Sequence, residues 1–240
     1  MHRGVVVAVG ALVGCGRIGF DASDGSGRID APACTVTPRY VTSACLDHDG
    51  GAQASLAVAL PAAIPAGTLV VASLDYDDLN ATVSISDTLG STFVPASAAF
   101  QSTRQTAQTF HAIAPADGTD TITASWSASI QTMTLFVHAY SGIDLAQPLV
   151  NAAGKLGSSR TLMTDPIAVA AHELVVAHGN IVNVGITGAG PDLTVRQTCN
   201  DNMTADLVAA AAGSVTPMFD ADGAAPWIVT ATTYRPAVCP

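Results

Sequence analysis

The chain has 240 residues, of which 49% are hydrophobic and 12% are charged, and its formal net charge is -10 at pH 7. A chain this rich in apolar residues can bury a substantial core, which excludes an intrinsically disordered protein. An acidic protein with a pI near 4.6 repels the phosphate backbone, so we expect no nucleic-acid partner.

The first residues are typical of an export signal. A basic start, Met1 to Arg3, precedes an apolar run that ends at Gly14, which is the layout of a signal peptide. The run is too short to cross a bilayer, which takes about 20 apolar residues. No later segment is both long and free of polar residues, so we expect a mature chain without a transmembrane helix.

The apolar run ends in Leu12-Val13-Gly14-Cys15, which resembles the lipobox of bacterial lipoproteins. The resemblance implies removal of residues 1–14 and attachment of diacylglycerol and fatty acyl chains such as palmitate to Cys15. Two or three acyl chains anchor a protein lastingly on a membrane. Gly16 follows the cysteine, where Asp would favour inner-membrane retention, so we expect the outer membrane, with the protein facing the periplasm or the cell surface. The alternative is an ordinary signal peptide with an incidental cysteine.

The remaining cysteines predict disulfide bonds. If Cys15 carries lipid, four cysteines are left, an even number in an oxidising compartment, so we expect two disulfides. Three connectivities are possible, and we favour the short local loop Cys34–Cys45 together with Cys199–Cys239. A zinc site is disfavoured because the sequence has no Cys-x-x-Cys pair.

Composition divides the chain into four segments. Residues 1–14 are predicted to be the lipoprotein signal peptide, and residues 15–33, rich in Gly, Ser and Asp, a lipidated flexible spacer. Residues 34–53 are predicted to be a lead-in segment closed by a disulfide, and residues 54–240 one β-sandwich domain. No internal repeat is recognisable in the sequence.

The last segment has the texture of an all-β protein. Short runs rich in Val, Ile, Thr and Ala alternate with Gly, Pro, Asp and Asn, as in a sandwich of antiparallel strands. Residues 206–212 could be helical by their alanines, but the flanking turn residues argue against it, so we predict no helix. We predict about a dozen strands, at 54–60, 68–76, 82–87, 92–94, 105–114, 120–127, 131–141, 161–169, 173–181, 193–199, 205–211 and 227–234.

Five phrases carry a resemblance, by their order, to a bacterial β-sandwich module of secreted and surface proteins. The resemblance covers residues 54–236 and implies an antiparallel, two-sheet sandwich similar to jelly-roll and concanavalin-like folds. It implies a surface location but no catalytic residues. The phrases are Gly67-Thr68-Leu69-Val70-Val71-Ala72, Ser86-Asp87-Thr88-Leu89-Gly90-Ser91-Thr92-Phe93, Ala139-Tyr140-Ser141-Gly142-Ile143, His172-Glu173-Leu174-Val175-Val176 and Ala231-Thr232-Thr233-Tyr234-Arg235-Pro236.

The aspartates suggest a calcium site. Asp75, Asp77 and Asp78 end a predicted strand and could offer several oxygens to Ca²⁺, which takes six to eight. A solvated turn that ends a strand is the alternative explanation. The same alternative applies to Asp220–Gly223, Asp47–Gly51 and Asn200–Asn202, since Asp, Asn and Gly are ordinary turn residues.

Enzymatic chemistry has little support. Glu173, the single glutamate, lacks an obvious second carboxylate for a glycosidase. His111, His138 and His178 fall within predicted strands, where a histidine is usually a half-buried packing residue. We therefore predict no catalytic residues and no cofactor other than possible calcium.

The leading hypothesis is a membrane-anchored, surface-displayed, non-enzymatic module that binds an extracellular glycan or an envelope protein. Only 5% of residues are aromatic, and among them Tyr40 and Tyr76 are best placed for exposure. A polysaccharide hydrolase or lyase and a purely structural envelope component are the alternatives.

Overall fold

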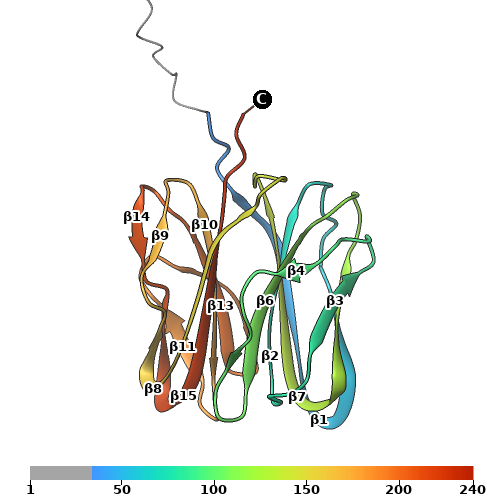
Figure 1. Ribbon diagram of the computed structural model, residues 1–240, viewed down its shortest axis with the longest axis vertical. Coiled ribbons are helices and arrows are strands. Elements are labelled where there is room, and N and C mark those ends of the chain that lie inside the picture. Colours follow the sequence, from blue (N-terminus) through green and yellow to red (C-terminus); the bar gives the residue numbers. More distant parts are fainter. Residues whose placement is uncertain (1–33, 240) are drawn as a thin grey trace, which may run out of the picture. The chain divides into compact units, whose positions relative to one another are not determined.

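The computed structural model describes residues 34–239. Within this range the chain forms fifteen strands and no helix, arranged as two antiparallel sheets that pack together (Figure 1). The predicted all-β, two-sheet fold is confirmed, while its jelly-roll order stays a prediction. No helix of the described residues is long and apolar enough to span a membrane.

The first sheet has seven strands, in the order β1-β7-β2-β6-β4, with β3 beside β7 and β5 beside β6. Their bounds are β1 Arg39–Ala59, β2 Leu69–Tyr76, β3 Val83–Asp87, β4 Val94–Pro95, β5 Phe100–Gln101, β6 Thr106–Ile113 and β7 Thr121–Ser141.

The second sheet has six strands, in the order β11-β15-β10-β13-β12, with β8 beside β15, and β9 pairs separately with β14. Their bounds are β8 Leu149–Met163, β9 Ile167–Val169, β10 Leu174–Ile181, β11 Ile186–Ala189, β12 Thr194–Cys199, β13 Asn202–Val208, β14 Gly213–Val215 and β15 Met218–Tyr234.

Each sheet folds over a hydrophobic core of its own. β1 and β7 pair along almost their whole length, but their register shifts between Asp49 and Ser55, where both strands bend. The bend brings Trp126, near the start of β7, against the same core as Leu135 in its second part. β15 and β8 shift register in the same way between Asp220 and Ala225, around a second core that contains Trp227.

The two sheets are copies of one topology. The order β1-β7-β2-β6, with β3 beside β7, is repeated as β8-β15-β10-β13, with β11 beside β15. We call residues 39–141 the first half and residues 149–234 the second half. An internal repeat is therefore present, although none is recognisable from the sequence alone.

Strand registers fix which residues of the two halves are equivalent. Leu69 pairs with Tyr140 in the first half, and Leu174 pairs with Tyr234 in the second. Each leucine begins the tetrapeptide Leu-Val-Val-Ala. Only these four consecutive residues of the central strands are identical, which explains why the repeat escapes a reading of the sequence.

The halves face one another through a largely polar layer. In β2, Val70 and Leu74 point into the first core, so the alternate residues Ser73 and Asp75 point toward the second sheet. Both are almost fully buried. Apolar contacts across the layer are concentrated at one end, where Leu69, Val71, Tyr140, Ile143, Leu174, Val176 and Tyr234 form a small cluster.

The disulfides correct the pairing favoured from the sequence. Cys34 bonds to Cys239 and Cys45 bonds to Cys199, so the local Cys34–Cys45 pairing is wrong. The reason is that β1 already begins at Arg39, and the extended chain from there to Cys45 spans about 20 Å at ~3.3 Å per residue. Disulfide-bonded Cα atoms lie within about 7 Å. One bond joins the two ends of the described range, and the other joins the two halves.

Candidate functional site

A buried hydrogen-bonded cluster crosses the polar layer. The Nε2–H of His178 on β10 donates to Asp75 Oδ2 on β2 at 3.1 Å, and Asn202 Nδ2 on β13 donates to Asp75 Oδ1 at 3.1 Å. The amide oxygen of Asn202 accepts from the backbone N–H of Ile181 at 3.1 Å. All three polar side chains are at most 3% exposed. Asp75 and His178 lie too deep for a ligand to reach, and the cluster fixes how the halves pack.

A second cluster lies beside it. Tyr140 OH and Arg196 Nε each donate to Asp206 Oδ2 at 2.7 Å, and the guanidinium of Arg196 stacks 4.1 Å from the ring centroid of Tyr40. Burial and the nearby Asp206 carboxylate raise the pKa of Tyr140 well above its usual value. The phenol therefore stays protonated as a hydrogen-bond donor.

Contacts across the layer are reciprocal. Tyr140 of the first half meets Asp206 of the second, and Tyr234 of the second half meets His111 of the first, with ring centroids 5.7 Å apart. Asp206 and His111 are equivalent, because they pair with the equivalent residues Val176 and Val71. Such reciprocity indicates an approximate two-fold relation between the halves.

A polar pocket of about 350 Å³ opens where this layer reaches one end of the strands. Both halves contribute to it, which is a common position for a ligand site. Asp49, Asp77, Arg104, Gln105 and Thr132 come from the first half, and Ile181, Val182, Asn183, Val184, Asn200, Asp201 and Asn202 come from the second.

The second half holds its part of the pocket rigidly. β12 and β13 are joined by Asn200 and Asp201, which have φ angles of 47° and 63°, the conformation of a type I′ hairpin turn. Cys199, immediately before the turn, is bonded to Cys45 of β1. Asn202, immediately after it, is held by the buried cluster. The pocket wall is therefore preorganised.

Acceptor groups dominate the pocket. Asp77 and Asp49 contribute carboxylates, and Arg104, 3.8 Å from Asp77, is the single basic side chain in the lining. Burial raises the pKa of Asp77, against an opposing contribution from Arg104. Asp77 Oδ1 and Gln105 Oε1 are buried without a hydrogen-bond partner among residues 34–239. The exposed carboxylates of Asp49 and Asp201, which also line the pocket, can accept hydrogen bonds from a ligand.

The three aspartates considered for calcium are not brought together. Asp75 lies in the buried cluster, Asp77 lines the pocket, and Asp78 Oδ1 accepts from the backbone amides of Asn80 and Ala81. No group of three or more His, Cys, Asp or Glu residues with metal-binding geometry occurs in the described range. The structure thus gives each of these carboxylates a separate role.

Other residues singled out from the sequence contribute to turns and to packing. Glu173 Oε2 accepts from the backbone N–H of Ala170 at 3.1 Å and stabilises the turn before β10. Tyr76, expected to be exposed, is only 3% exposed, because it packs edge-on against Trp126 in the first core. Tyr40 is 38% exposed but lies under Arg196. Cys15 lies outside the described residues.

The sequence indicated the pocket only in fragments. Asp49, Asp77 and the 200–202 turn stood out as acidic or turn residues, but Arg104 and Gln105 carried no signal. The pocket takes short contributions from several segments that are far apart in the chain. Only the pairing of the two halves brings them together.

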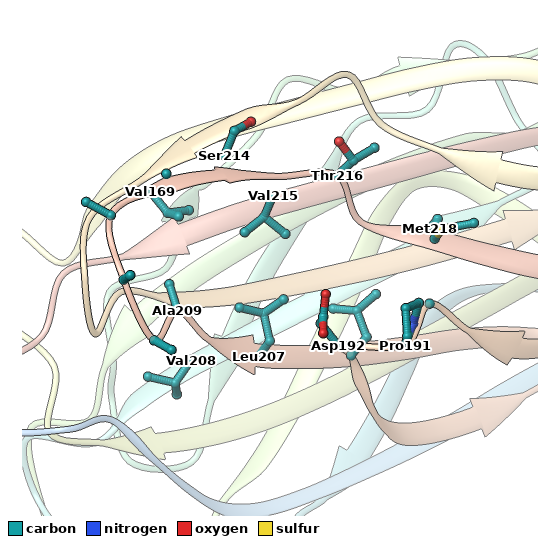
Figure 2. A pocket seen from close by; sticks show the side chains of 16 residues that line it. Val169, Pro191, Asp192, Leu207, Val208, Ala209, Ser214, Val215, Thr216 and Met218 are labelled. Carbon is teal, nitrogen blue, oxygen red and sulfur yellow. The ribbon is translucent and has the colours of Figure 1, made fainter.

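A second, larger concavity is an apolar groove of about 680 Å³ (Figure 2). It lies between the end of β13, near Leu207, and the segment from β14 to Met218. The loop of four alanines, Ala209–Ala212, closes one end of it, and Pro191 and Asp192 lie at its rim.

Comparisons of the chain with models of protein families, with curated proteins and with solved structures find no match. The resemblance to a bacterial sandwich module therefore stays a prediction.

Proposed function

We propose that the protein is an exported, non-enzymatic binding module, anchored to the outer membrane through lipid on Cys15, that takes a glycan in the polar pocket. The observation that carries the proposal is the preorganised cavity of about 350 Å³, lined by carboxylates, amides and one guanidinium from both halves. The two disulfides indicate an oxidising environment outside the cytoplasm, where such ligands occur.

The position of the pocket suits display away from the anchor. Arg39 pairs with Ser141 at the end of β1 nearest the Cys34–Cys239 bond. Asp49 pairs with Thr132 ten positions along the same strand, a distance of about 30 Å at ~3.3 Å per residue. The pocket therefore lies at the other end of the domain from Cys34, the first described residue.

The chemistry of the pocket suits sugar hydroxyl groups. Hydroxyls donate to carboxylate and amide oxygens, and the Arg104 guanidinium can donate to ring or hydroxyl oxygens. Aromatic rings are absent from the pocket lining, so recognition depends on hydrogen bonds and not on ring stacking.

A glycan array followed by calorimetric titration of the best oligosaccharide tests the proposal. Asp77→Asn and Arg104→Ala should each weaken binding by about tenfold, the effect of losing one or two ligand hydrogen bonds to a charged group. Asp47→Asn, which alters an exposed carboxylate on β1 outside the pocket, is the matched control and should leave binding unchanged. Absence of any glycan binding would refute the proposal, and cleavage of a bound glycan would favour the hydrolase or lyase alternative.

The anchor is tested separately. Cells expressing the protein should incorporate labelled palmitate into it, and Cys15→Ser should abolish the label. If the label persists in Cys15→Ser, or is absent from the wild type, the anchor is wrong while the pocket proposal stands. A purely structural component would be anchored but would bind no glycan.

A further inference from the structure

The apolar groove differs between the two halves. In the second half, Val169, Val175 and Ala209 form a small buried cluster with Leu207 and Val215 packed against it, and all of these residues except Val175 line the groove (Figure 2). Ala210, Ala211 and Ala212 are exposed at its end. Their methyl groups are too small to fill the space between β13 and β14.

The equivalent place in the first half holds a smaller hollow of about 290 Å³, lined by Ala112 and Ile113, which the registers make equivalent to Leu207 and Val208. There Ile64 forms an isolated bridge with Gly118, as β9 pairs with β14 in the second half. Ile64 is 1% exposed, and the side chain of Leu89 lies against Gly118, 3.0 Å from where a Cβ would be. The same topology thus forms a larger groove in the second half than in the first.

The negative charge at the groove favours an apolar ligand that carries a positive charge. Asp192 is the only ionisable side chain in the lining of the groove, it is exposed, and it makes no salt bridge within residues 34–239. The formal net charge of the chain is -10. A carboxylate ligand would therefore be repelled, whereas a cation at the rim would be attracted.

We propose that this groove is a second binding site, independent of the polar pocket, for an aliphatic ammonium compound. The hydrocarbon chain would lie along Leu207 and Val215, and the ammonium group would meet the carboxylate of Asp192. A volume of about 680 Å³ falls within the range of about 300–1,000 Å³ of small-molecule sites.

Calorimetric titration of the purified protein with n-octylammonium, n-octanol and n-octanoate, each below its micellar concentration, separates two contributions to binding. One is that of the hydrocarbon chain, and the other is that of the charged head group. Octylammonium should bind about two- to fivefold more tightly than octanol, the effect of one solvent-exposed ion pair. Octanoate should bind least tightly of the three. In Asp192→Asn, octylammonium and octanol should bind with equal affinity within error.

Val215→Trp places a large ring in the groove and should exclude the hydrocarbon chain of the ligand. The affinity for every octyl compound should therefore fall about tenfold or more. Val195→Trp, on β12 outside the groove, is the control and should bind like the wild type. Circular dichroism spectra of both variants check folding. The proposal is overturned if no octyl compound binds, or if octanoate binds as tightly as octylammonium. It is also overturned if an extended peptide is the only ligand whose binding is lost in Val215→Trp.

Discussion

His138 makes the stability of the protein depend on pH. Its side chain is fully buried in the polar layer, and neither ring nitrogen has a hydrogen-bond partner among residues 34–239. Burial lowers its pKa to about 3, with smaller contributions from His178 and Arg196. In the unfolded chain the ordinary histidine pKa of about 6.5 applies. Below that pH the unfolded chain binds more protons than the folded one, so stability is lost as pH falls.

The magnitude follows from the interval between the two pKa values. One unit corresponds to about 1.4 kcal/mol, so lowering the pH from about 6.5 to about 4.5 removes about 2.7 kcal/mol of unfolding free energy through this residue. The loss continues until the folded pKa of about 3 is reached. His138→Phe should remove this dependence, because phenylalanine is uncharged and can occupy the place beside Tyr140 where the imidazole stacks, with ring centroids 6.4 Å apart.

The assay is urea unfolding followed by tryptophan fluorescence, without reductant, at several pH values between about 7 and about 4.5. The difference in unfolding free energy between wild type and His138→Phe should change by about 2.7 kcal/mol across this range. Thr134→Val, at another fully buried position of β7, should shift the unfolding free energy equally at every pH. Parallel curves for wild type and His138→Phe would refute the reasoning.

Three further predictions concern stability and use the same unfolding assay. Asp75→Ala should lower the free energy of unfolding by about 3–5 kcal/mol, because it leaves two buried donors without their acceptor. Asp165→Ala, which removes an exposed ion pair, is the control and should lower it by less than about 1 kcal/mol. Equal losses for the two variants would contradict a buried role for Asp75. Replacing Cys34 and its partner by serine should cost about 4 kcal/mol, since the remaining disulfide leaves an effective loop of about 50 residues, and an unchanged midpoint would argue against that bond. Gly157→Ala should destabilise by about 1–3 kcal/mol, because a Cβ there would overlap the ring of Trp227. Gly188→Ala, with open space around it, is the control and should be near neutral.

The sequence predicts strands well where one face is apolar and poorly where glycine replaces large side chains. β2, β6 and β10 lie within a residue or two of their predicted bounds. β8 was missed over most of its length because Gly154 and Gly157 look like turn residues. In the structure a ring from another strand covers each of them, Phe100 over Gly154 and Trp227 over Gly157, and this packing supports a strand through glycine. That support depends on residues distant in the chain, so local pattern cannot reveal it.

The disulfide pairing and the polar pocket were missed for a related reason. Cys45 pairs with Cys199 because β1 and β12 come together when the two halves pack, and nothing local to either cysteine indicates this. The pocket likewise exists only once Asp77 of the first half faces Asn183 of the second. Features within one strand are therefore predictable here, and features between the halves are not.

The polar layer explains why the pocket lies at the boundary between the halves. Each half already buries its own apolar core, so the halves pack with only a small apolar cluster at one end of their contact. Hydrogen bonds between buried groups can then fix their relative position, at the cost of leaving donors and acceptors that must be satisfied. The register makes Asp75 equivalent to Asn180, and His178 equivalent to Ser73, so the bond from His178 to Asp75 has no identical counterpart across the layer. The two halves thus differ at their contact face while sharing one topology. A ligand in the pocket would contact side chains from both halves and would therefore stabilise their packing.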